Sequence, residues 1–329
     1  MSNLPFSLAL VVALIAVLGC QPSSESDDSR RAQRRFLSIG TAPPGGAFFP
    51  IGGALSEVLN AHSGEASWQF TAEATKGTKE NIRRLVAGDL DLALANAAIT
   101  YFAVRGEASW DEPHEVRTVM TLAPNVAMFL TAQGSGIRSI ADLAGHRVTV
   151  GPAGAGFEDF LGPILQAHGA SFDQFTPLNA IQSTAVGMLA DGSADAAYLG
   201  GVIPTASVTQ ASSAQEIFFV PYEEEALDAL TSSYPFFRRF TIPAGTYRGM
   251  DTDFPGMVVG ALHLIASAAA DEEMVYRVTR TLYESRQQVI ERHAVGRAIT
   301  PENVVRETGT EFHPGAVRFY REAGIWPDD

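Results

Sequence analysis

Residues 85–93 read Leu-Val-Ala-Gly-Asp-Leu-Asp-Leu-Ala, and residues 189–197 read Leu-Ala-Asp-Gly-Ser-Ala-Asp-Ala-Ala. Each stretch has the pattern of a helix end, a glycine, an aspartate and a short apolar strand. Residues 36–40 and 147–151 form a second matched pair, in which an apolar strand ends in glycine. All βαβ units share some of this pattern, but two matched signals in the same order favour two similar α/β lobes. The spacing is too long for the unit of a solenoid.

The first half alternates strands and helices. Strands are expected at 36–40, 68–74 and 90–95, and helices near Ile51 and from an N-cap at Thr78 to a C-cap at Gly88. A βαβαβ order predicts a mostly parallel sheet covered by helices.

Two apolar stretches divide the rest of the chain. The strands expected at 126–131 and 258–265 lead into a second lobe and back out of it. We therefore expect lobe I to comprise 36–125 plus 259–329, with C-terminal helices from Asp271 to Arg292 and from Pro314 to Ala323, and lobe II to comprise 126–258.

Composition excludes several functions. Apolar residues make up 46% and charged residues 18% of the chain, which suits a large core. The net charge is −14, which argues against binding to nucleic acid or to an anionic membrane.

The N-terminus reads as an export signal. The apolar run from Leu8 to Gly19 is shorter than the roughly 20 residues of a membrane span and suits a signal peptide. It ends at Cys20, the one cysteine of the chain, and Val-Leu-Gly-Cys resembles a bacterial lipobox despite the bulky Leu18. We expect a lipoprotein signal peptide at 1–20, lipidation of Cys20, a flexible tether at 21–35, and a periplasmic or cell-surface protein held to the membrane only by its lipid. An ordinary secretory signal and an uncleaved anchor are the alternatives.

No catalytic or cofactor motif is present. The sequence has no P-loop, no correctly spaced dinucleotide fingerprint, no zinc-protease motif and no nucleophile elbow. Its seven histidines lack metal-ligand spacing. We therefore expect no cofactor, no metal and no enzymatic activity.

Two glycine-rich loops follow predicted strands, at Thr41–Phe49 and Gly151–Glu158. Ligands of α/β sheets bind outside the carboxyl ends of the strands, and helix N-termini favour anions. The two loops facing each other across a cleft would form a carboxylate clamp, although each alone also reads as a tight turn.

Several segments resemble the TAXI class of TRAP-transporter solute-binding proteins. They include Gly45–Pro50, Glu73–Thr78, Gly201–Thr205, Ile242–Tyr247 and His313–Ala316, and the resemblance runs from about Phe36 to Ile325. It implies an α/β, two-lobe, periplasmic-binding-protein-like (type II) fold with two hinge strands and a central cleft. It also implies the membrane subunits of a TRAP transporter as partner, and a glutamate- or glutamine-like or less polar carboxylate as ligand.

The resemblance also implies the ligand contacts. By position they are Thr41, Ala42, Gly45, Gly46, Phe48, Phe49, Thr75, Gly77, Thr78, Asn81, Asn96, Gly154, Ala155, Gly156, Phe157 and Gly201.

Departures from the family pattern remove polar groups from these loops. Pro43 and Pro44 lack a backbone N–H, Phe48 and Phe49 stand where Tyr-Tyr is usual, and Ala98, Ala155 and Phe157 replace polar residues. We therefore expect a ligand less polar than glutamate, or weak binding of glutamate. A sensory or interaction lipoprotein that reuses this fold without transport remains the alternative function.

Overall fold

The computed structural model describes residues 35–44, 46–64 and 67–327. The expected signal peptide, Cys20 and nearly all of the expected tether lie outside the described residues, as does Gly45. The first strand begins at Arg35, one residue earlier than expected, because the Arg35 amide donates a hydrogen bond to the Ser67 carbonyl.

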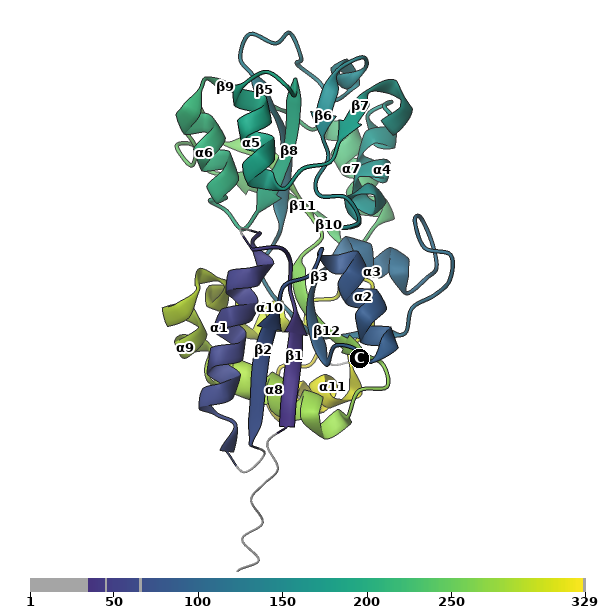
Figure 1. The fold of residues 1–329 in the computed structure, drawn as a ribbon, viewed down its shortest axis with the longest axis vertical. Helices are drawn as coiled ribbons and strands as arrows, with labels where there is room; N and C mark the ends of the chain where they lie inside the picture. Colours follow the sequence, from purple (N-terminus) through teal and green to yellow (C-terminus); the bar gives the residue numbers. More distant parts are fainter. Residues whose placement is uncertain (1–34, 45, 65–66, 328–329) are drawn as a thin grey trace, which may run out of the picture. The chain divides into compact units, whose positions relative to one another are not determined.

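In the part of the chain that the structure describes, five strands form a first sheet in the order β2-β1-β3-β12-β4 (Figure 1). They are β1 (Arg35–Gly40), β2 (Trp68–Glu73), β3 (Leu92–Asn96), β4 (Val116–Thr121) and β12 (Leu262–Ser267). Strand β1 pairs in parallel with β2 and β3, whereas β12 runs antiparallel to β3 and β4. The parallel expectation thus holds for the first three strands, and the antiparallel member is the strand that returns from the second lobe.

The second sheet has the order β10-β11-β5-β8-β6-β7, with β9 paired to β5, over the same described residues. Its strands are β5 (Val126–Ala132), β6 (Arg147–Thr149), β7 (Thr176–Leu178), β8 (Ala196–Gly201), β9 (Ile217–Val220), β10 (Phe237–Ile242) and β11 (Phe254–Val259). Strand β6 pairs in parallel with β7 and β8, and the other pairs are antiparallel, so this sheet is mixed rather than mostly parallel.

The chain passes between the sheets twice, from β4 to β5 and from β11 to β12. The second passage corrects the expectation of one strand over 258–265: β11 ends at Val259 and β12 starts at Leu262. Gly260 breaks the strand because its φ is +95°, a left-handed conformation that extended strands do not use.

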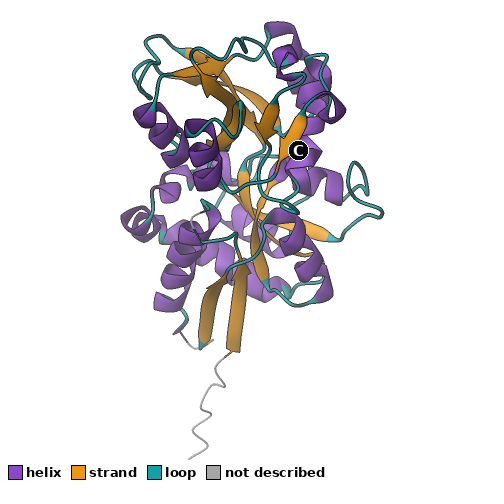
Figure 2. Ribbon diagram, turned by 45° about the horizontal axis from the view of Figure 1, so that its top comes forward, coloured by secondary structure: helices purple, strands orange, loops and turns teal. Residues whose placement is uncertain are grey.

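Helices cover both faces of the first sheet (Figures 1 and 2). On one face, Ile51, Val275, Val289 and Phe319 share a core with the sheet, and on the other Ile82, Leu85 and Phe102 do so. The helices of this lobe are α1 (Phe48–Ala61), α2 (Thr78–Ala87), α3 (Ala97–Ala103), α8 (Glu272–Glu284), α9 (Arg286–Arg292), α10 (Pro301–Val304) and α11 (Pro314–Glu322).

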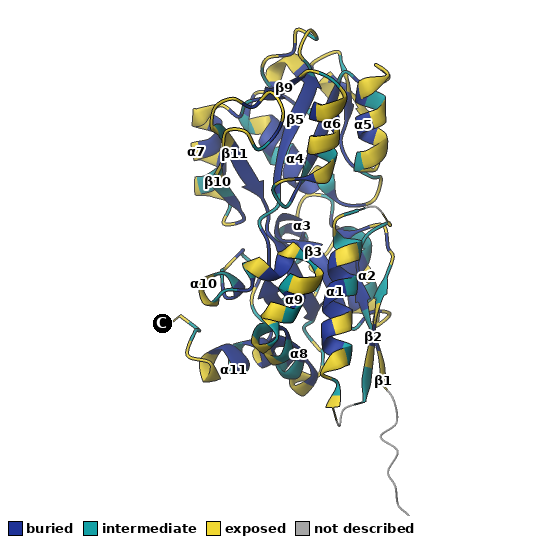
Figure 3. Cartoon of the chain, turned by 90° about the vertical axis from the view of Figure 1, so that its left-hand side faces the viewer, coloured by how far each residue is buried: buried dark blue, intermediate teal, exposed yellow. Residues whose placement is uncertain are grey.

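The second sheet is covered in the same way: its central strands β5 and β8 are buried, and the outward faces of its helices are exposed (Figure 3). Phe160 and Leu227 pack on one face, and Val186 and Val208 pack on the other. The helices here are α4 (Phe157–Ala167), α5 (Gln182–Ala190), α6 (Ala206–Ala214) and α7 (Glu224–Ser233).

The two ends of α2 test the capping residues that the sequence predicted. Gly88 ends α2 with a φ of +78°, which confirms the predicted C-cap. The predicted N-cap at Thr78 is wrong: Gly77 holds that position, and the Thr78 hydroxyl accepts a hydrogen bond from the Asn96 amide instead. A cap residue must lie just outside the helix, and Thr78 is its first helical residue.

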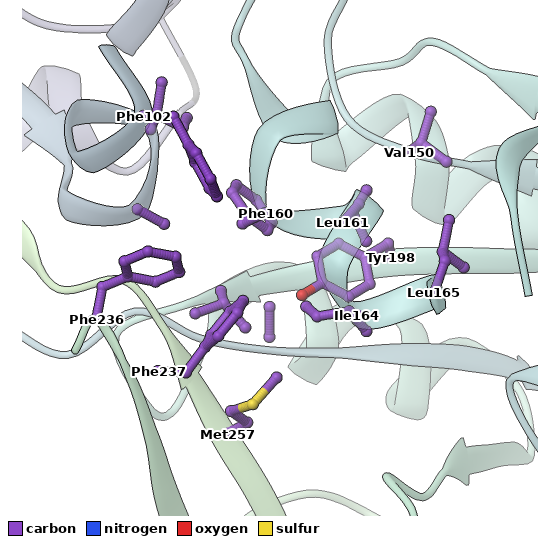
Figure 4. Close-up of a cluster of buried hydrophobic side chains, with 14 of the residues drawn as sticks. Phe102, Val150, Phe160, Leu161, Ile164, Leu165, Tyr198, Phe236, Phe237 and Met257 are labelled. Atoms are coloured by element: carbon purple, nitrogen blue, oxygen red, sulfur yellow. The ribbon is translucent and has the colours of Figure 1, made fainter. Parts of the chain in front are cut away.

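One apolar core crosses from one lobe to the other (Figure 4). Tyr101 and Phe102 of α3 meet Phe236 at centroid distances of 5.0 and 5.7 Å, and Phe102 and Phe236 share the cluster with Phe160 and Tyr198 of the second lobe. The lobes are therefore joined by side-chain packing as well as by the two passages of the chain.

His263 of β12 is buried beneath α3. One imidazole nitrogen lies 2.9 Å from the Thr100 hydroxyl and the other 3.5 Å from that of Thr118. Burial lowers the pKa of His263 from its ordinary 6.5 to about 3.

We predict that His263 makes the fold sensitive to acid. Its folded-state pKa lies below its unfolded value, so its contribution to stability is present above pH 6.5 and is lost as the pH falls from 6.5 towards 3. The slope from this one group is at most about 1.4 kcal/mol per pH unit. Urea unfolding across this range should show a shallower pH dependence for His263→Gln than for the unaltered protein. His62→Gln, at an exposed site, controls for the loss of an imidazole. Parallel curves for the unaltered protein and His263→Gln would contradict the assignment.

Candidate functional site

A cavity of about 110 Å³ lies between the two sheets. Its walls come from the loop and helix start at 42–51, from 76–78 and from Leu262 of the first lobe. The second lobe contributes 152–160, 181–182 and 198–202. A small organic molecule placed here would touch both lobes at once, as ligands of two-lobe proteins do.

Nine of the residues predicted as ligand contacts line this cavity. They are Ala42, Gly46, Phe48, Gly77, Thr78, Asn96, Ala155, Phe157 and Gly201. Six described residues from the same prediction are not part of the lining, namely Thr41, Phe49, Thr75, Asn81, Gly154 and Gly156. Gly45 lies outside the described residues.

Two of those six residues, Asn81 and Thr75, instead hold the loop after β1 in place. The Asn81 side-chain amide donates to the carbonyls of Thr41 (2.7 Å) and Leu94 (2.8 Å). The Thr75 hydroxyl donates to the same Thr41 carbonyl at 2.9 Å and accepts from the Gly77 amide. Asn81 is fully buried. These side chains position the backbone that lines the cavity, and their own polar groups face the protein.

Asn96 lines the cavity, but its side-chain amide also makes hydrogen bonds to the backbone. The side-chain oxygen accepts from the Ala98 and Ile99 amides and so caps α3. The side-chain nitrogen donates to the carbonyls of Val259 (3.0 Å) and Gly260 (3.3 Å) at the return passage between the sheets. An added Cβ on Gly260 would approach Ala98 N to 2.7 Å, so this passage requires glycine.

The second-lobe wall is organised in the same way. The Gln182 amide donates to the Gly200 carbonyl at 2.8 Å and accepts from the Gly200 amide at 3.3 Å. The Thr205 amide donates to the Tyr247 hydroxyl at 2.8 Å, which ties the Gly201–Thr205 segment to the Ile242–Tyr247 segment. These two segments, singled out in the sequence, therefore act together to hold the wall that follows β8.

The two loops expected to form a carboxylate clamp lead into α1 and α4. Helix α4 carries Glu158 and Asp159 in its first turn, which opposes binding of an anion there. Helix α1 has no acidic residue in its first turn, but Pro50 there lacks a backbone N–H.

Helix α2, which was not part of the expected clamp, also begins at the cavity wall. Its Thr78 and Lys79 backbone N–H groups make no hydrogen bond within the described ranges, and its first turn holds one acidic residue, Glu80. With two free N–H groups and one acidic residue against the two of α4, the α2 side is the more favourable place for an anion.

Sequence reasoning missed several lining side chains. Lys76, Asn125, Gln182 and Tyr198 all line the cavity. Lys76 is adjacent in sequence to predicted contacts, and its position could have identified it as a lining residue. Tyr198 lies inside a strand, where the sequence offers no sign that its side chain faces a ligand. Burial raises the pKa of Tyr198, which keeps its phenol neutral, and its oxygen has no hydrogen-bond partner of good geometry among the described residues.

Next to the cavity, α4 contacts the first lobe through a buried carboxylate. Asp159 accepts hydrogen bonds from the Trp110 indole (2.9 Å) and the Ser109 amide (3.2 Å). Burial raises the pKa of Asp159 above its ordinary value. The adjacent Glu158 pairs with Lys79 of α2 at 3.2 Å. These polar contacts join the lobes on the side where the aromatic core also crosses.

The chain matches the model of the NMT1-like family over residues 39–324. This protein belongs to the NMT1-like family. The match spans both lobes and every described residue of the cavity lining.

Solved structures show the same fold as this NMT1-like protein. A structure described as a periplasmic transporter has a TM-score of 0.51 at 12% identity, over 88% of this chain and 93% of that one. A Bordetella bronchiseptica RB50 protein also has a TM-score of 0.51, at 12% identity over 90% and 91% of the two chains. The Xanthomonas citri protein XAC2383, bound to ATP, reaches 0.51 at 10% identity over 88% and 96%. These likenesses confirm the two-lobe, mixed α/β periplasmic-binding-protein fold, and at such identities they show the fold alone.

The structure of the NMT1-like chain also bears on metal binding and on membrane crossing. Among residues 35–44, 46–64 and 67–327, no cluster of three or more metal-ligating side chains is present. Within the same ranges, none of the helices combines the length and the apolar composition that a membrane crossing requires.

We predict that Asn81→Ala mainly lowers the stability of the protein and does not remove a direct ligand contact. Loss of two buried hydrogen bonds, which leaves carbonyl groups short of a donor, should lower the free energy of unfolding by about 2–3 kcal/mol. Urea denaturation monitored by circular dichroism measures this. The exposed Asn179 donates one bond of 3.2 Å, and Asn179→Ala should cost less than about 1 kcal/mol. An Asn81→Ala protein as stable as the unaltered one would show that the network does not position the loop.

Proposed function

We propose that this NMT1-like protein is an extracytoplasmic solute-binding receptor. It captures a small organic acid in the cavity between its lobes and delivers it to the membrane subunits of a TRAP-type secondary transporter.

The proposal rests on one observation. The cavity has walls from both lobes, and the chain passes twice between these lobes. A ligand that contacts both lobes binds better when they are together than when they are apart, and so shifts the equilibrium towards the closed arrangement. A membrane partner can recognise that arrangement, which makes capture and delivery one physical process.

Assignment to the TRAP type is supported by the segments that resemble the TAXI class. Their roles here are structural. Tyr247 supports the wall after β8, and His313 caps α11 by accepting from the Gly315 amide. An added Cβ on Gly315 would collide with the Glu272 carbonyl of α8, so glycine at this position allows α11 to pack tightly on α8. Receptors that share one architecture are expected to share residues that hold the cavity wall and pack the helices in this way.

The proposed ligand contacts are the nine predicted residues that line the cavity, together with Lys76, Asn125 and Tyr198. The proposed location is the periplasm or the cell surface, with the protein held to its membrane by a lipid on Cys20.

Ligand retention tests the proposed function. Native mass spectrometry of the full chain purified from its own cell envelope should show a small organic acid bound to one site and released on unfolding. Adding that acid at 100 times its Kd should stabilise the protein by about 2.7 kcal/mol.

Ala155→Leu provides the matched variant. A Cβ added to Gly77 of the first lobe would lie 3.5 Å from the Ala155 Cβ of the second, so a larger side chain at 155 obstructs the meeting of the lobes. Ligand-dependent stabilisation should be lost in Ala155→Leu and kept in Ala153→Leu, because Ala153 is exposed and lies outside the lining. If the purified protein retains no organic ligand and binds none that is added, the proposed function is wrong.

Lipidation is tested separately. Cys20→Ser should move the protein from the membrane fraction to the soluble periplasmic fraction and abolish incorporation of a labelled fatty acid, since the thiol is the acceptor. Ser24→Ala, four residues further on, should leave both unchanged. A Cys20→Ser protein that stays in the membrane fraction would indicate an uncleaved anchor.

A further inference from the structure

We infer that the cavity takes an organic monoanion without an ammonium group and with an apolar body, and that Lys76 recognises its charge. This inference rests on the proposed function and narrows its ligand.

The charge of the cavity lining limits the ligand. Within the described lining, Lys76 is the one charged side chain, and no aspartate or glutamate is present. The ammonium of an amino acid would enter the cavity without a carboxylate to pair with, and a second acidic group of a dicarboxylate would lack a cation. A desolvated charge without a partner is strongly unfavourable. The lining therefore selects against amino acids and dianions.

Lys76 is placed to meet an anion. It precedes Gly77 at the start of α2, beside the backbone N–H groups of Thr78 and Lys79 that make no hydrogen bond within the described residues. The chain contains only two lysines. The other, Lys79, is held by Glu158 and by the Ser109 hydroxyl, whereas the Lys76 ammonium has no carboxylate within 4.0 Å among the described residues. The Glu80 carboxylate accepts a hydrogen bond from the Lys76 backbone N–H at 3.1 Å but does not belong to the cavity lining. In a protein of net charge −14, the Lys76 ammonium and the two backbone N–H groups are the features of the described lining that attract an anion.

The remaining wall suits an apolar body. Phe48 approaches from the first lobe and Phe157 and Phe160 from the second, with Ile51 and Leu262 beside them. The lining amides of Asn96 and Gln182 are already bonded to the backbone. Tyr198 adds one buried, neutral phenol whose oxygen makes no hydrogen bond of good geometry among the described residues. A ligand with several polar groups would find few free partners here.

A matched set of probes tests the ligand class on the purified full chain by titration calorimetry. Phenylacetate and phenylmethanesulfonate carry one anionic group on the same aromatic body, and tight binding of either supports the inference while distinguishing the two acids. Phenylglycine adds an ammonium to phenylacetate, phenylmalonate adds a second carboxylate, and phenylacetamide removes the charge. Each of these three should bind at least about tenfold more weakly than the better monoanion, because each mismatches the single positive charge.

Variants test the role of Lys76. Because Lys76 is exposed at the edge of the cavity, Lys76→Met should weaken monoanion binding by about three- to tenfold and reduce its dependence on salt. Lys76→Arg, which keeps the charge, should restore most of the affinity. Arg321→Met makes the same change of net charge on the exposed face of α11, outside the cavity lining, and should change the affinity less than about twofold.

The outcomes separate this inference from the proposed function. Tighter binding of phenylglycine, phenylmalonate or phenylacetamide, or equal affinity of Lys76→Met and the unaltered protein, overturns the inference while a receptor function stands. If none of the probes binds, the small molecule retained from the cell envelope decides: a monoanion supports the inference, and a zwitterion, dianion or neutral compound overturns it. No retained molecule and no binding overturns both.

Discussion

The Asn96 side chain connects three parts of the molecule. It ends β3, caps α3 by accepting from Ala98, and donates to the Val259 and Gly260 carbonyls where the chain returns from the second sheet. The amide is buried, so every bond that it lost would leave a polar group away from water. The same residue lines the cavity. The passage between the sheets, the register of β12 beside β3 and one wall of the cavity therefore depend on a single amide.

That arrangement explains the polarity of the cavity. Asn96 and Gln182 are polar by type, yet their amides hold the backbone of the walls. Asn81 and Thr75 do the same from behind the first loop. Most buried polar side chains in proteins have a hydrogen-bond partner, and for these residues the backbone provides it. The surface that remains towards a ligand is mostly apolar, with a positive charge at Lys76.

On one side of the cavity, side-chain contacts join the lobes in addition to the two strands that pass between them. Rings of α3 pack against Phe236, and Asp159 accepts hydrogen bonds from Trp110 and Ser109. Separating the lobes on this side would expose aromatic surface and leave a carboxylate without its donors. Motion that admits a ligand is therefore expected on the side of α1 and α5, where this aromatic core does not extend.

Local sequence patterns by themselves determined the alternating strands and helices, the glycine that ends α2 and the division into two lobes, because burial periodicity and left-handed glycines act over a few residues. They misplaced the N-cap at Thr78 and joined β11 to β12. Both errors arise at contacts with Asn96, which is distant in sequence from Gly260. The resemblance to the TAXI class brought residues such as Phe48 and Ala155 into one proposed site but did not separate them from Asn81. Only the tertiary structure decided which polar groups face the cavity, because that choice depends on which backbone groups, far apart in the chain, need a hydrogen-bond partner.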